Sequence, residues 1–290
     1  MKIAIVALNP PTVAGGAERA VFYLQKMFSE AGFEVGILSC SCFSKDYKGI
    51  LWDLRRLGAY RLSGRGKTIV SVSKSTAEGV KRYFKLKTHA VIENAVDTDL
   101  FKPRGEKNQL RKRFGLPVNQ FLGLFVGRAE YGKGIDILQK IVPQLDSETS
   151  LIMVLSGKKF TLEKSFCLCN VPYIDMPLLY SACDFFILPS RYEGCSFSVI
   201  EAMASGLPIL ISRVGHTREI SKKESRLAEF VLEDLDPDLF VKKINQLKNN
   251  EKLRRELGRR EREYVLKNNS LEIFKEKWLN LVKSLVADKR

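Results

Sequence analysis

A glycine-rich segment, FVGRAEYGKGIDIL at 125–138, has the composition of a phosphate-binding loop. Gly127, Gly132 and Lys133 fit the first seven positions of the pattern G-x-x-x-x-G-K-[ST], in which backbone amides and a lysine hold phosphates. The eighth position, where a Ser or Thr hydroxyl would bind Mg²⁺, is Gly134. The segment therefore has the flexibility and the cation for a phosphate, but it lacks the metal ligand. Either it is a decayed P-loop or it binds phosphate for a different chemistry.

Two glutamates belong to a second candidate site, within LPSRYEGCSFSVIEAMASGLPIL at 188–210. The pattern predicts a strand ending at Pro189, a loop carrying Glu193, and a helix containing Glu201. The N-terminus of a helix at the carboxyl edge of a parallel sheet binds anions, because its free N–H groups carry partial positive charge. Two carboxylates beside a phosphate site are better explained as acceptors for sugar hydroxyls. A nucleotide sugar contains both kinds of group, since a diphosphate joins its two sugars.

Strands and helices alternate along both halves of the chain, which predicts two α/β domains with parallel sheets. Apolar runs predict strands at 2–8, 33–40, 68–73, 89–94, 121–127, 150–157, 185–190 and 207–212. The segment 222–290 is charged and amphipathic, and it is predicted to be helical throughout. We expect an N-terminal domain over 1–98, a polar linker over 99–118, and a C-terminal domain over 119–271.

The formal net charge of +15 fits a nucleic acid, an anionic membrane surface or a phosphorylated substrate as the partner. We expect no nucleic acid, because zinc-finger spacing and the aromatic RNP motif are absent. Cations gather near aromatic and leucine side chains at 53–67 and 81–87, as in segments that lie on a bilayer; the alternative is a set of solvated helix faces. No apolar run reaches the 18 or so residues of a membrane span. We therefore expect a cytoplasmic protein with peripheral association to an anionic membrane.

The six cysteines include two C-x-C pairs, Cys40/Cys42 and Cys167/Cys169. This spacing does not resemble a secreted disulfide framework. A zinc site built from both pairs is one interpretation. Reduced cysteines packed in or near the cores are the favoured interpretation.

Several ordered motifs resemble those of glycosyltransferase family four, the retaining group with the GT-B fold. Glu193 and Glu201, with seven residues between them, match the E-x7-E motif of that family. The segment 125–138 matches its VGR…KG…L motif, and VIENAVDTDLFKP at 91–103 matches its linker motif, with Ala95 where Gly is usual. SVSKSTAEGV and the early GGAER also fit. Each motif is weak alone, but their order along the chain is specific.

The resemblance implies a GT-B fold, in which two Rossmann-like domains with parallel sheets face each other across a cleft. It implies transfer of a hexose from a nucleoside diphosphate sugar, with retention of the anomeric configuration. Arg128 and Lys133 would hold the diphosphate in place of Mg²⁺, so that no metal or other cofactor is needed. Glu193 would bind the transferred sugar and Glu201 the ribose. The other residues implied in donor binding are Gly15, Gly16, Gly127, Gly194, Cys195, Ser196, Phe197, Ser198 and Val199. His216 stands where the family usually has Gly; it either contacts the donor or is tolerated in a loop.

The same resemblance gives expectations for the ends of the chain and for the acceptor. The final helix, within 272–290, is expected to cross back and complete the N-terminal domain. Fewer than thirty residues separate Cys40 from Thr68, where the family carries acceptor contacts. The acceptor could be a glycan, a lipid or a protein, and we expect the basic stretch 48–67 to dock the enzyme on the membrane that presents it. A degenerate, non-catalytic protein that binds a nucleotide sugar or a partner is the alternative.

Overall fold

The computed structural model describes residues 2–7, 16–39, 68–156, 160–169 and 171–287. Gly15, the Cys40/Cys42 pair and the basic stretch 48–67 lie outside the described residues, and so do the predictions that rest on them. Within the described ranges, no helix has both the length and the hydrophobicity needed to cross a bilayer.

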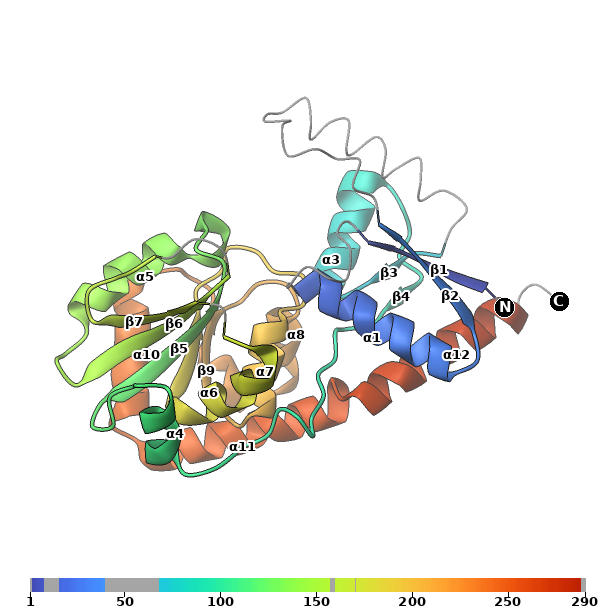
Figure 1. Ribbon diagram of the computed structural model, residues 1–290. Helices are drawn as coiled ribbons and strands as arrows, with labels where there is room; N and C mark the ends of the chain where they lie inside the picture. The colour runs from blue at the N-terminus through green and yellow to red at the C-terminus, as the bar shows by residue number, and fades with distance from the viewer. Residues whose placement is uncertain (1, 8–15, 40–67, 157–159, 170, 288–290) are drawn as a thin grey trace.

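The N-terminal domain pairs its strands in parallel, as the apolar runs predict (Figure 1). Strand β1 pairs with β2, and β3 pairs with β4. Gly32, with φ of +81°, follows α1 and supplies the left-handed conformation common after helix ends. The elements are β1 (Lys2–Ala7), α1 (Gly16–Glu30), β2 (Glu34–Ser39), β3 (Val70–Ser71), α3 (Lys74–Gly79), the π-helical turn η1 (Val80–Phe84) and β4 (Ala90–Val91).

The C-terminal domain is built on a six-stranded parallel sheet with the strand order β10-β9-β8-β5-β6-β7. Its strands are β5 (Phe121–Gly127), β6 (Thr149–Leu155), β7 (Ser165–Cys169), β8 (Phe185–Leu188), β9 (Ile209–Ser212) and β10 (Val231–Leu232). Its helices are α4 (Lys107–Arg113), η2 (Tyr131–Lys133), α5 (Ile135–Ile141), η3 (Val142–Gln144), η4 (Tyr173–Asp175), α6 (Met176–Ala182), α7 (Phe197–Ala204), α8 (Thr217–Lys223), α9 (Ser225–Ala228), α10 (Pro237–Lys248) and α11 (Glu251–Asn268).

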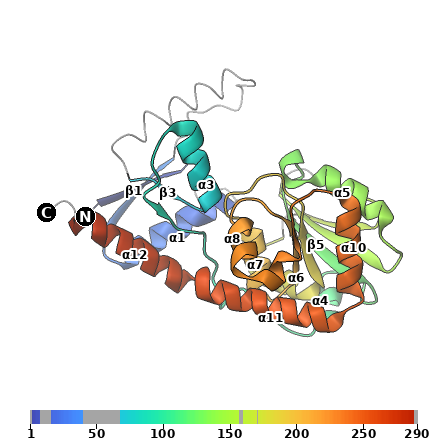
Figure 2. The same cartoon turned by 180° about the vertical axis from the view of Figure 1, so that it is seen from behind.

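The strand order reverses between β5 and β8, which lie side by side although β6 and β7 separate them in the sequence. Helices α5 and α10 cover one face of the sheet, and α6 and α7 cover the other (Figure 2). In doubly wound folds, ligands bind outside the carboxyl ends of the strands at such a reversal. The segments that follow β5 and β8 are the two segments that carry the candidate chemistry.

Two short strands depart from the expected pattern. Residues 222–290 were expected to be helical throughout, and this is wrong at β10, which forms one edge of the sheet. Strand β7 forms the other edge and was not predicted; its burial pattern mixes exposed and half-buried positions. Edge strands lack the continuous apolar run that marks a strand buried on both faces.

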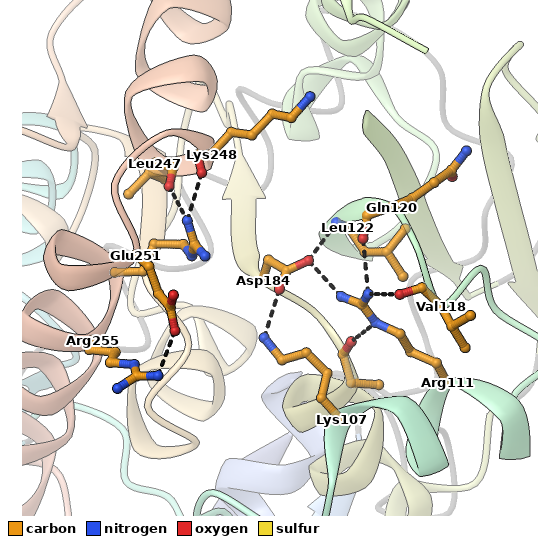
Figure 3. A network of polar contacts seen from close by, with 12 residues as sticks. Lys107, Arg111, Val118, Gln120, Leu122, Asp184, Leu247, Lys248, Glu251 and Arg255 are labelled. Carbon is orange, nitrogen blue, oxygen red and sulfur yellow. Dashed lines mark hydrogen bonds and ion pairs between the residues drawn. The ribbon is translucent and has the colours of Figure 1, made fainter. Parts of the chain in front are cut away.

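The predicted linker over 99–118 contains helix α4, which packs onto the C-terminal domain (Figure 3). Arg111 is buried, and its guanidinium donates to Asp184 Oδ2 at 2.6 Å and to the carbonyl oxygens of Ala182, Val118 and Gln120. Asp184 also accepts from Lys107 at 2.7 Å and from the backbone N–H of Leu122 at 2.7 Å. This network joins α4 to the starts of the two central strands.

The last helix, α12 (Leu271–Ala287), runs back along the N-terminal domain (Figures 1 and 2). Phe274 packs in a core cluster with Met27 and Phe28 of α1 and with Ile92. Between α11 and α12, the side chain of Asn269 donates to Asn94 O at 2.9 Å, and Val96 N–H donates to Asn269 O at 2.9 Å. The chain passes between the domains twice, after β4 and again between α11 and α12. These hydrogen bonds join the two segments to each other.

Candidate active site

The carboxyl ends of β5 and β8 bring Lys133 and Glu193 together. Lys133 lies in η2, after the glycine-rich turn that begins at Gly127, and Glu193 lies in the loop after β8. The Lys133 ammonium donates to Glu193 Oε1 at 2.6 Å, and Ser190 Oγ donates to the same oxygen at 2.7 Å. The two charged side chains are 21% and 10% exposed. A half-buried cation and carboxylate thus meet at the reversal of strand order.

Gly134 has a structural reason to be glycine. Its φ is +74°, and a Cβ built there would lie 2.0 Å from Pro189 O. A Ser or Thr at this position would therefore collide with backbone and adopt an unfavourable left-handed conformation. The eighth position of the motif is closed to the metal-binding hydroxyl of a P-loop, so the geometry disfavours the decayed P-loop.

The loop from Glu193 to Ser196 is held by the turn before α8. The backbone N–H of His216 donates to Gly194 O at 3.0 Å, and Ser196 N–H donates to His216 Nδ1 at 3.3 Å. Gly215, with φ of +58°, allows this approach, because a Cβ there would lie 2.2 Å from Glu193 O. Burial lowers the pKa of His216 to about 4, so the imidazole is neutral at pH 7 and can accept a hydrogen bond.

His216 holds the loop in place through these two hydrogen bonds. Its contact with the donor stays a prediction. Its Nε2 is buried and has no hydrogen-bond partner among the described residues. Cys195 is also buried, and burial raises the pKa of its thiol, so the side chain packs as an uncharged group. These side chains lie beneath the loop and shape its backbone.

The first turn of α7 offers backbone donors. Phe197, Ser198 and Val199 are its first three residues, whose N–H groups have no acceptor within the helix. Ser196 is the N-cap, but its side chain makes no capping bond and lies 3.2 Å from Ser198 Oγ. Free N–H groups and the helix dipole make this turn suited to an anion.

Glu201 is buried within α7, where it meets a cation from the other domain. Arg19 of α1 forms an ion pair with Glu201 Oε1. Tyr180 OH donates to Oε2 at 2.9 Å, and Tyr173 OH donates to Oε1 at 3.4 Å. Burial raises the pKa of the Glu201 carboxyl, and Arg19 and the tyrosine hydroxyls oppose this shift. The second glutamate of the motif thus joins the two domains.

Arg19 was not identified from the sequence as a site residue, although it closes the GGAER motif. Its guanidinium lies 4.4 Å from the centre of the Tyr173 ring. Burial lowers the pKa of Arg19, but the negative charge of Glu201 acts in the opposite direction, and the net result is a raised pKa. Arg19 therefore stays charged.

A sequence comparison decides the family. The sequence model described as "Glycosyl transferases group 1" matches residues 106–264, which include the whole site of the C-terminal domain. The chain belongs to this glycosyltransferase family. The expected family is confirmed.

Curated relatives of this glycosyltransferase match over part of their length. The putative teichuronic acid biosynthesis glycosyltransferase TuaC of Bacillus subtilis is 29% identical over 58% of this chain and 44% of the relative. The D-inositol 3-phosphate glycosyltransferase of Xylanimonas cellulosilytica is 28% identical over 57% of this chain and 45% of the relative. The aligned region thus spans about half the length of the relatives that it matches.

Solved structures confirm the GT-B fold of this glycosyltransferase. Sucrose-phosphate synthase from Thermosynechococcus elongatus superposes with a TM-score of 0.80 at 17% identity, covering 99% of both chains. Anabaena HepE in complex with UDP-glucose superposes with a TM-score of 0.75 at 15% identity, covering 98% of this chain and 100% of HepE.

Two more contacts dock the N-terminal domain of the glycosyltransferase onto the C-terminal domain. Asn94 Nδ2 donates to Cys195 O at 2.7 Å. The backbone N–H of Lys74, at the start of α3, donates to Glu219 Oε1 at 2.9 Å. Lys74, Asn94 and Cys195 lie in the sequence motifs, but nothing in the spacing of those motifs indicates these contacts.

Arg128, Gly16 and Gly127 were also predicted to be site residues, and the structure places them as follows. Arg128 is exposed, and it pairs with Glu130 at 3.1 Å; no contact described here joins it to the Lys133–Glu193 pair. Gly16 begins α1, three residues before Arg19. Gly127 ends β5, and a Cβ there would be 3.8 Å from Lys133 Cδ. The diphosphate role of Arg128 stays a prediction.

Proposed function

We propose that this glycosyltransferase transfers a hexose from a nucleoside diphosphate sugar to an acceptor, with retention of anomeric configuration. The observation that carries the proposal is the Lys133–Glu193 pair beside the free first turn of α7 at the strand-order reversal. A cation and N–H groups suit a diphosphate, and the carboxylates of Glu193 and Glu201 suit sugar hydroxyls. The UDP-glucose complex of the similar HepE fold supports this class of donor.

In this proposal the protein acts mainly on the leaving group. The bond between the sugar C1 and the phosphate oxygen breaks, and the acceptor oxygen bonds to C1 from the same face. The acceptor proton passes to the departing phosphate oxygen. Lys133 and the α7 N–H groups stabilise the negative charge that develops on the diphosphate, an effect that often dominates catalysis. Glu193 already bonds Lys133 and Ser190, so it is better placed to orient the sugar than to attack it.

Transfer can be tested by release of nucleoside diphosphate. UDP-, GDP- and ADP-sugars are incubated with the protein, with and without a mixed glycan and glycolipid extract, and the product is examined by NMR. We expect one donor class to be consumed in an acceptor-dependent way, giving a product with the donor's anomeric configuration. An inverted product would refute retention, and slow hydrolysis without transfer would favour the degenerate, non-catalytic protein.

The two glutamates should affect donor binding differently. Glu201→Gln is expected to weaken binding of the nucleoside diphosphate alone by about 0.5–1.5 kcal/mol, the usual range for a hydrogen bond. Glu193→Gln should leave that affinity unchanged and reduce discrimination between donor sugars. Isothermal titration with the diphosphate and with two of its sugars separates these effects. Equal losses of nucleotide affinity in both variants, with sugar preference intact, would contradict this division of roles.

Metal removal provides another prediction. Activity is expected to persist in EDTA, because Lys133 supplies the charge and Gly134 leaves no room for a metal-binding hydroxyl. The measurement is the rate of nucleoside diphosphate release before and after chelation. Complete inhibition that Mg²⁺ reverses would show that a metal ion carries the phosphate.

A further inference from the structure

A cationic groove lies on the N-terminal domain, and none of the residues assigned to the donor lines it. Its volume is about 1280 Å³, and α3, the π-helical turn η1 and the following segment to Thr88 line it. Arg218 of α8, in the C-terminal domain, also lines it. Helices α3 and α8 lie close together in both views (Figures 1 and 2). The groove therefore spans the junction of the two domains.

The charges on this groove are unbalanced. Among the described residues, its lining includes five cations, Lys81, Arg82, Lys85, Lys87 and Arg218, and one carboxylate, Glu78. All five cationic residues are exposed, and in the described part of the chain none of them forms an ion pair. Like charges gathered around a concave surface raise the local concentration of anions.

The backbone around these cations has an unusual conformation. Val80–Phe84 forms a π-helical turn, a rare conformation that is frequent at functional sites. Lys85 follows it with φ of 55°, in the left-handed region that non-glycine residues seldom adopt. Backbone strain of this kind is frequent at ligand-binding segments.

The groove is near the loop from Glu193 to Ser196. Arg218 precedes Glu219, which binds the start of α3, and Arg218 N–H donates to Gly215 O at 3.3 Å. Gly215 in turn packs against the backbone of Glu193. A Cβ built at Gly194 would lie 3.7 Å from Thr76 Oγ1, so the loop that carries Glu193 passes beside the start of α3, where Ser75 and Ala77 line the groove.

We propose that this groove binds the phosphate group of a phosphorylated acceptor. Lysine and arginine side chains bind phosphate through charge-assisted hydrogen bonds, and five of them can bind one or two phosphates. The end of the groove at the start of α3 is the end nearest the loop that carries Glu193, so the unphosphorylated part of the acceptor would extend from there toward the transferred sugar. This inference rests on the proposed function, since it assigns the acceptor of that reaction.

The test compares two variants that remove the same charge. The groove variant is Lys81→Gln/Arg82→Gln/Lys87→Gln, and the control is Lys112→Gln/Lys140→Gln/Lys242→Gln, three exposed lysines elsewhere. Binding is measured with glucose 6-phosphate by calorimetry and with phosphatidylcholine vesicles containing phosphatidic acid by sedimentation. Wild type and control are expected to bind at least one probe at least about 10-fold more tightly than the groove variant, about the effect of one charged hydrogen bond.

The two probes separate the sources of the phosphate. Binding of glucose 6-phosphate assigns a soluble sugar phosphate, and binding of the vesicles alone assigns a lipid-borne phosphate. Equal binding by groove variant and wild type, or no binding of either probe by wild type, would overturn the proposal. So would a groove-dependent preference for an RNA oligonucleotide over both probes.

Donor binding keeps this test separate from the proposed function. The groove variant should retain the wild-type rise in melting temperature with its nucleotide sugar. Lys133→Ala should retain phosphate binding in the groove. If the groove binds phosphate but no nucleotide sugar binds the wild-type protein, the proposed reaction fails and the groove remains a phosphate site.

Discussion

Replacing Asp184 by Ala is expected to lower the free energy of unfolding of the C-terminal domain by about 3–5 kcal/mol. Asp184 is the carboxylate that faces the buried Arg111 guanidinium, and it also accepts the backbone N–H of Leu122 (Figure 3). Its removal leaves a cation buried without its counter-ion, and burial of an unpaired charge is far costlier than loss of a surface pair. Urea unfolding followed by circular dichroism measures the change.

The same carboxylate offers a matched control. Lys107 also bonds Asp184, at 2.7 Å, but its side chain is 44% exposed. Lys107→Ala should cost at most about 1 kcal/mol, as exposed ion pairs do. A loss of less than about 1 kcal/mol for Asp184→Ala, equal to that of Lys107→Ala, would show that the network contributes little to stability.

Lys133→Ala is expected to reduce kcat/KM for the donor by about 10- to 150-fold. This corresponds to about 1.5–3 kcal/mol, the range for a hydrogen bond to a charged group. The ammonium is mostly enclosed, and it is the cation paired with Glu193. Its loss removes positive charge from the place where the diphosphate would leave. The measurement is kcat/KM from nucleoside diphosphate release.

An exposed lysine serves as the control for this variant. Lys140→Ala removes the same charge from the exposed side of α5 and should leave kcat/KM unchanged. Unaltered kinetics in Lys133→Ala, with the fold intact, would remove Lys133 from the catalytic machinery.

The sequence predicted the centre of the fold better than its edges. Strands β5, β6, β8 and β9 are buried apolar runs, and a parallel sheet covered on both faces requires such runs. Strand β7 was missed because its side chains are half-buried or exposed and form no continuous apolar run. Helix α4 was missed because its polar residues resemble a linker, and its burial depends on an aspartate far along the chain.

The candidate site was predicted as a set of residues, but not as an arrangement. Lys133 and Glu193 were both identified from motifs, yet their contact depends on β5 and β8 being neighbours. Arg19 pairs with a glutamate 182 residues away, so no local pattern indicates it. His216 was expected to face the donor, and its position beneath the loop depends on the turn at Gly215.

The central claim is that a nucleoside diphosphate sugar binds at Lys133, Glu193 and Glu201. The most direct test is a thermal-shift screen of UDP-, GDP- and ADP-sugars with wild type and Lys133→Ala. A ligand present at 100 times its Kd stabilises the folded state by about 2.7 kcal/mol, so one donor class should raise the wild-type melting temperature clearly. The same ligand concentration should raise the melting temperature of Lys133→Ala much less. No shift with any nucleotide sugar, or equal shifts in the two proteins, would contradict the proposed site.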